Sequence, residues 1–218
     1  SNPETFEPDM RQLMNLEQSR AFFCTGMAGF EEAMREKIAE NFPSLRICDS
    51  SGEIIPLMHT HEGGVVHEDY DPHIWTSLKN ARIIAAEMLN EIIEIDPAGE
   101  QIYSENFRKL DSRLAQLDDS ITRVLEPSRG ASFLVWHPSL SYFARDYGLR
   151  QLAMEPEGKE ASPAALRERI DRVAGENPRV FFIQREYDSR QAEALARELG
   201  VRTEKIAVMQ PDIMEQAR

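Results

Sequence analysis

The sequence predicts an α/β protein in which two lobes of parallel β-sheet are joined by one long helix. Short apolar runs alternate with segments of helical periodicity early in the chain, and the same alternation returns in its last third. Between them, residues 97–125 carry apolar side chains at three- or four-residue intervals, with no proline or glycine after Gly99. Strands that alternate with helices pair in parallel, so we expect a separate sheet on each side of the long helix.

The first lobe is predicted to hold two strands. Residues 9–20 show helical spacing after a proline and an aspartate, which favour a helix start. Apolar runs at 21–25 and 45–49 predict strands, and the helical pattern of 30–39 connects them. A helix with an apolar stripe follows at 78–92.

The long helix and the second lobe follow from the same patterns. At about 1.5 Å per residue, a helix over 97–125 reaches on the order of 40 Å, longer than a small lobe is wide. After it we expect alternating elements, which are a strand at 131–136, a helix at 139–147, a strand at 151–154, a helix at 163–174, a strand at 180–184, a helix at 189–199 and a final strand at 205–209. The predicted domains are therefore an N-terminal lobe at 1–96, an interlobe helix at 97–127 and a C-terminal lobe at 128–218.

Composition limits the function classes. Hydrophobic residues make up 41% of the 218 residues and charged residues 29%, which is typical of a globular protein. The net charge of −13 disfavours nucleic acid as a partner, because a polyanion requires a basic surface. No stretch approaches the roughly 18 apolar residues that would span a bilayer. Cys24 and Cys48 each lie in a predicted strand, and their spacing does not require a disulfide.

The histidines carry the strongest signal for function. Four of the five lie between residues 59 and 73, and we expect residues 58–71 to form a mobile surface loop, because they lack periodicity and contain two adjacent glycines. Neutral imidazole is a common metal ligand, so the tract indicates metal handling. His73 stands at a helix start, and His137 directly follows a predicted strand, at the end where parallel sheets bind ligands.

Common enzyme motifs are missing from the chain. There is no His-Glu-x-x-His, and the His59-Thr-His61 pair lies in the predicted loop rather than at a strand end. A nucleophile elbow, a P-loop and a dinucleotide fingerprint are also lacking. A metal-dependent hydrolase, with Glu155 as the general base, therefore remains only an alternative hypothesis.

Four segments resemble, in order, the zinc/manganese ABC transporter solute-binding proteins, the ZnuA/TroA-like superfamily. The resemblance covers essentially the whole chain and rests on Pro-Glu-Thr-Phe-Glu-Pro at 3–8, Thr-Gly-Met-Ala-Gly-Phe-Glu at 25–31, Asp-Pro-His-Ile-Trp at 71–75 and Trp-His-Pro-Ser-Leu-Ser-Tyr-Phe-Ala-Arg-Asp-Tyr-Gly-Leu at 136–149. The resemblance implies a metal site in a cleft between two α/β lobes. It also implies delivery of the ion to a membrane permease.

The resemblance implies the ligands as well. His73 and His137 match two metal ligands of the family, and Glu4 stands where the family usually has a histidine. A carboxylate there would weaken the preference for zinc, so manganese or another divalent transition ion stays open. Candidates for the fourth ligand are Gln210, Glu155, Glu186 or water. The histidine-rich insertion is similar to that of the zinc branch, and it predicts that His59, His61 and His67 collect metal weakly.

We therefore expect a monomeric, non-catalytic carrier that captures zinc and passes it to an ABC permease. The resemblance places it in the periplasm or lipid-anchored on the outer face of the cytoplasmic membrane. Family members begin with a strand, a helix and a second strand that precede the segment at 3–8, so the first lobe is expected to be incomplete. A metal-binding adhesin or buffer without a permease is a further alternative.

Overall fold

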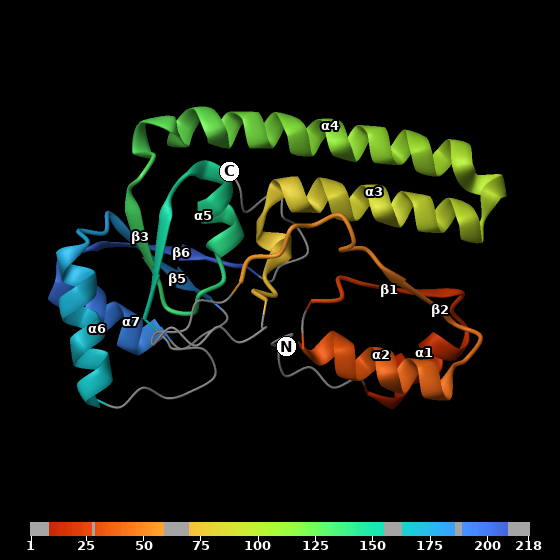
Figure 1. The fold of residues 1–218 in the computed structure, drawn as a ribbon, viewed down its shortest axis with the longest axis horizontal. Coiled ribbons are helices and arrows are strands. Elements are labelled where there is room, and N and C mark those ends of the chain that lie inside the picture. The colour runs from red at the N-terminus through yellow and green to blue at the C-terminus, as the bar shows by residue number, and fades with distance from the viewer. Residues whose placement is uncertain (1–8, 28, 59–69, 155–162, 186–188, 209–218) are drawn as a thin grey trace. The chain divides into compact units, whose positions relative to one another are not determined.

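The strands of the computed structural model form two separate parallel sheets (Figure 1). The structure describes residues 9–27, 29–58, 70–154, 163–185 and 189–208. One sheet pairs β1 (Ala21–Cys24) with β2 (Arg46–Asp49). The other has the order β4-β3-β5-β6, formed by β3 (Ser132–Val135), β4 (Arg150–Ala153), β5 (Val180–Gln184) and β6 (Arg202–Ile206). The predicted α/β class with two parallel sheets is confirmed.

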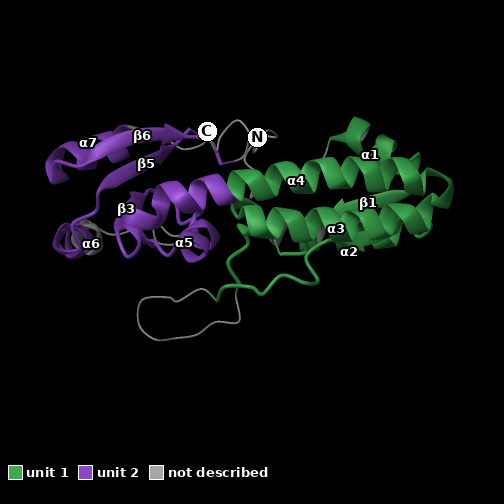
Figure 2. Cartoon of the chain, turned by 90° about the horizontal axis from the view of Figure 1, so that it is seen from above, with its two compact units in different colours: residues 1–118 green, residues 119–218 purple. Residues whose placement is uncertain are grey.

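The chain divides into two compact units, residues 1–118 and 119–218 (Figure 2). The division falls within the long helix α4 (Glu100–Leu125), which follows a short 3-10 turn, η3 (Pro97–Gly99). With 26 residues, α4 is about 40 Å long at 1.5 Å per residue. The predicted long helix is thus present, and it belongs to both units.

Helices of the first unit connect and support its two strands. Helix α1 (Met10–Glu17) begins with a capping box between Asp9 and Gln12, and α2 (Gly29–Asn41) links β1 to β2. Helix α3 (Leu78–Ile95) is joined to β2 by Arg46, which forms ion pairs with Glu91 at 2.6 Å and with Glu94 at 2.5 Å. An ion pair between Arg82 and Asp111 joins α3 to α4 at 2.6 Å.

Both cysteines are free and buried. The parallel register pairs Phe23 with Cys48, and side chains alternate along a strand, so Cys24 and Cys48 point to opposite faces of the sheet. Burial, helped by the nearby Glu31 carboxylate, raises the pKa of Cys24 to about 11. Burial also raises the pKa of Cys48, whose thiol donates a hydrogen bond to Glu91. The cysteines therefore act as small core side chains in this structure.

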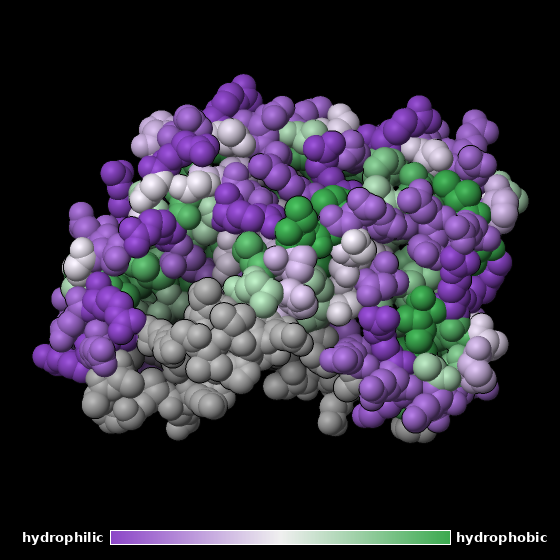
Figure 3. Space-filling view, viewed as in Figure 1, coloured by the Kyte–Doolittle hydropathy of each residue, from purple (hydrophilic) through white to green (hydrophobic). Residues whose placement is uncertain are grey.

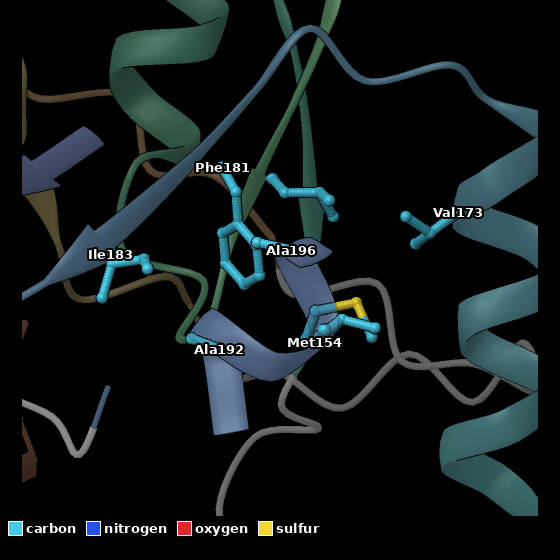
Figure 4. Close-up of a cluster of buried hydrophobic side chains, with 8 residues drawn as sticks. Met154, Val173, Phe181, Ile183, Ala192 and Ala196 are labelled. Atoms are coloured by element: carbon cyan, nitrogen blue, oxygen red, sulfur yellow. The ribbon is translucent and has the colours of Figure 1, made fainter. Parts of the chain in front are cut away.

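Apolar side chains cover both faces of the second sheet. On one face, Leu134 and residues of β5 pack against α6 (Pro163–Gly175) and α7 (Ser189–Leu199), in the cluster of Figure 4. On the other face, Phe133 and Val135 pack against α5 (Ser141–Tyr147). Strands buried on both sides read as continuous apolar runs, which is why β3 and β5 were predictable.

The end of α5 and the position of the last strand, β6, can be explained physically. Helix α5 ends at Gly148, whose φ of 67° is the left-handed conformation that glycine adopts without a steric penalty. The final strand was predicted at 205–209 but is β6, at 202–206. Among the strands that the structure describes, this edge strand pairs with β5 alone, and the side chains of Arg202 to Lys205 are exposed, so it lacks the apolar run on which the prediction relied.

Hydrophilic residues cover most of the described surface in the view of Figure 3, and hydrophobic residues form small separate groups. This pattern agrees with a chain in which acidic residues outnumber basic ones by 38 to 25. Within the described part of the chain, no helix combines the length and the apolar character that a bilayer crossing requires.

Candidate metal centre

Asp71, Pro72 and His73 form a tight, buried turn in the first unit. One carboxylate oxygen of Asp71 accepts a hydrogen bond from the backbone N–H of His73 at 2.9 Å, which is the geometry of an Asx-turn. The same oxygen lies 2.7 Å from Nδ1 of the His73 ring. Both side chains are 3% exposed, so this contact is shielded from water.

This contact determines which ring nitrogen can bind a metal. A carboxylate only accepts hydrogen bonds, so Nδ1 of His73 carries the proton. In the neutral ring the lone pair then belongs to Nε2. A histidine held by a carboxylate in this way is a common arrangement among metal ligands, because the carboxylate orients the ring and raises its basicity. The Asp71–His73 pair thus has the chemistry of one half of a metal site.

The structure on the C-terminal side holds the His73 turn in place. A short 3-10 helix, η2 (Ile74–Thr76), follows directly, and the Thr76 hydroxyl donates to the His73 carbonyl at 2.8 Å. Trp75 lies beside the imidazole, with 5.3 Å between the ring centroids. The Asn80 side chain, from the first turn of α3, donates to the Ile74 carbonyl at 3.1 Å. His73 is therefore fixed to the start of α3 through several contacts.

His137 lies at the carboxyl end of β3 in the second unit, two residues beyond Val135, and it is 8% exposed. Its backbone N–H donates to Oε1 of Gln184 at 3.2 Å, and its carbonyl accepts from Nε2 of Gln184 at 2.8 Å. The same amide nitrogen donates to the Ser139 hydroxyl at 2.7 Å. One fully buried glutamine from β5 therefore holds the turn that carries His137.

A second glutamine holds the residues that follow. Gln151 of β4 accepts from the backbone N–H of Leu140 at 2.6 Å and donates to the Ser141 hydroxyl at 2.8 Å. Because β3 lies between β4 and β5, the segment after β3 is bound by one glutamine from each neighbouring strand. Neither Gln151 nor Gln184 was predicted as a site residue from the sequence. The available signal was a polar residue within or at the end of an apolar strand.

The remaining predicted ligands belong to segments that the structure does not describe. Glu4, Glu155, Glu186 and Gln210 lie outside the described residues, as do His59, His61 and His67. Among the described side chains, no three histidine, cysteine, aspartate or glutamate residues form a group that could hold a metal ion. The structure therefore describes His73 with Asp71 and, separately, His137 with Gln184.

The ends of the histidine-rich segment are joined by backbone contacts. Met58 and Tyr70 form an isolated antiparallel bridge, and the Asp71 N–H donates to the Leu57 carbonyl at 2.8 Å. These contacts fix the chain immediately before the Asp71–His73 turn. The structure differs from the predicted mobile loop at 58–71 at both ends of that segment, because residues 58, 70 and 71 form backbone contacts. Residues 59–69 lie outside the described residues.

Comparison with known proteins identifies the family. A family model described as ZnuA, the periplasmic component A of the zinc-uptake complex, matches residues 1–217. The chain belongs to the ZnuA family. This is a family of binding components of transport systems, so the chain is not an enzyme, and its described residues contain no membrane-spanning helix.

Individual ZnuA-family proteins agree with this assignment. A crystal structure of ZnuA covers 100% of this chain, and this chain covers 82% of it, with a TM-score of 0.88 and 31% identity. The high-affinity zinc uptake system protein ZnuA of Bacillus subtilis is 26% identical over 64% of the chain, and the zinc-binding lipoprotein AdcA of Streptococcus pneumoniae is 28% identical over 67%. The chain spans 44% and 30% of the lengths of these two relatives.

Proposed function

We propose that this chain captures a zinc ion outside the cytoplasm, with His73 and His137 as ligands, and delivers it to an ABC permease. Glu4 is the proposed third ligand. The observation that carries the proposal is the buried contact of 2.7 Å between Asp71 and Nδ1 of His73, which puts the lone pair of the neutral ring on Nε2.

Two kinds of support favour zinc as the ion. Imidazole ligands suit zinc better than manganese, which prefers carboxylate, carbonyl and water oxygens. A solved ZnuA deletion mutant with zinc bound covers the whole of this chain at 31% identity, with a TM-score of 0.87. Manganese and other divalent ions are competitors for the same ligands, and a carboxylate from Glu4 would favour them more than a third histidine would.

A titration of zinc against a chromophoric chelator tests the proposal. The His73→Ala, His137→Ala double variant should lose tight binding. Replacing His59, His61 and His67 together by alanine is the matched control, since it removes three imidazoles and should leave one tight site. Unchanged affinity in the double variant would refute the ligand assignment.

The pH of the titration gives a second readout. Protons compete with zinc for the ring nitrogens, so affinity should fall as the medium becomes acidic.

Delivery is tested separately. The test uses bacteria that lack their own zinc-binding component but keep the permease. Under zinc limitation the wild-type protein should restore their growth, and the double variant should not. Growth that the double variant restores equally well would contradict delivery through these ligands.

A further inference from the structure

Gln184 is a buried polar side chain whose hydrogen bonds to described residues lie in the His137 turn. It is the last residue of β5 and is 0% exposed. It accepts one hydrogen bond from the His137 N–H and donates two, to the His137 carbonyl and to the Ser139 hydroxyl. A buried amide is costly unless it is paired, so its presence at this position requires partners of this kind.

The turn has little regular structure of its own. Strand β3 ends at Val135 and α5 begins at Ser141, so His137 lies outside both elements. Its carbonyl also accepts from the Ser139 N–H at 2.8 Å, which is a local contact within the turn. Gln184 therefore provides the hydrogen bonds that connect the His137 backbone to the neighbouring strand.

We propose that Gln184 is a positioning residue of the metal site, which sets zinc affinity by fixing the backbone of His137 without contacting the ion. The proposal rests on the proposed function, because it requires His137 to be a ligand. A ligand whose backbone is already fixed loses less conformational freedom when the ion binds. Without Gln184, zinc binding must itself order the turn.

The variant Gln184→Met keeps the length of the side chain and removes its donor and acceptor. We expect zinc affinity to fall about tenfold, the lower end of the range for residues that support metal ligands, because Gln184 holds the backbone rather than the ring. Gln151→Met should have a smaller effect, since Gln151 contacts Leu140 and Ser141 but not His137.

A control separates positioning from general destabilisation. Val173, on α6, is buried in the cluster of Figure 4, on the sheet face covered by α6 and α7, and Val173→Ala removes core packing without touching the turn. Zinc affinity, the visible absorption of the Co²⁺-loaded protein and the melting temperature are measured for each variant. Gln184→Met should change the zinc affinity and the Co²⁺ absorption, whereas Val173→Ala should lower only the melting temperature.

Two outcomes would overturn the positioning role. One is wild-type affinity and a wild-type Co²⁺ spectrum in Gln184→Met, and the other is an equal loss of affinity in Val173→Ala. A parallel His137→Ala variant separates this inference from the proposed function. If His137→Ala binds zinc as tightly as the wild type, the proposed function fails and the inference fails with it. If only His137→Ala is weakened, the positioning role alone is wrong.

Discussion

Replacing Asp71 with asparagine tests the chemistry of the His73 side of the site. The substitution keeps the size of the side chain and removes its charge. The amide oxygen can still accept from the His73 N–H, so the turn should persist. That oxygen also faces Nδ1, so the charged contact with the ring is lost, and a neutral amide orients the ring and raises its basicity less than a carboxylate does. The variant should therefore fold but bind zinc less tightly.

The size of the effect follows from the contact that is lost. Removing the partner of a metal-ligating histidine typically weakens metal binding by about 10- to 100-fold. Because each tenfold corresponds to about 1.4 kcal/mol, the binding free energy should fall by about 1.4 to 2.8 kcal/mol. We expect a loss in the upper half of this range, because the side chains of Asp71 and His73 are each 3% exposed and water cannot replace the carboxylate.

Competition with a chromophoric chelator at neutral pH measures this difference directly. Asp111→Asn is the matched control, because it removes the same charge from the same unit, at an ion pair with Arg82 far along α4 in sequence. Thermal unfolding of both variants shows whether each is folded at the titration temperature. Wild-type zinc affinity in Asp71→Asn, or an equal loss in Asp111→Asn, would refute the reasoning.

Three further predictions concern the fold. Cys24 should resist alkylation by iodoacetamide at pH 8 in the folded protein, because burial raises its pKa to about 11, and mass spectrometry after unfolding should show it fully reactive. The hydrogen bond from Arg82 lowers the pKa of Asp111, so Asp111→Asn should lower the unfolding free energy by about 0.5 kcal/mol at neutral pH. That difference should be absent in denaturant titrations performed below the folded-state pKa of Asp111, where the wild-type carboxyl is also neutral. Gly148→Ala should cost about 1 to 2 kcal/mol in the same assay, since its φ of 67° strains any side chain, and an unchanged midpoint would contradict this.

Local patterns were sufficient for most elements of the fold. The apolar runs at β1, β2, β3 and β5 and the periodicity of α3 and α4 depend on nearest neighbours in sequence, so they could be identified without knowing the sheet. The final strand was also expected, but the bounds of the edge strand β6 could not be placed, because pairing with β5 on one side does not require apolar side chains. Its position depends on the partner rather than on its own composition.

The site was predictable only in part, for a similar reason. His73 and His137 were predicted as ligands from a helix start, a strand end and the family resemblance, whereas Asp71 entered only as part of the motif at 71–75. Its contact with Nδ1 of His73 follows from Asx-turn geometry, which a two-residue spacing from aspartate to histidine could have suggested. Gln184 acts through a strand order that no local pattern encodes, so its role appeared only in the structure.

The bridge between Met58 and Tyr70 also affects how this protein can vary. Because Met58 and Tyr70 pair with each other, we expect a change in the length of the segment between them to leave the Asp71–His73 turn in place. Closing a longer loop is inexpensive, about 0.6 kcal/mol for each doubling of its length. We therefore expect the length and the histidine content of the insertion to vary independently of the Asp71–His73 turn. For protein engineering, residues 58 and 70 mark a position where a reporter or another metal-binding peptide can be inserted.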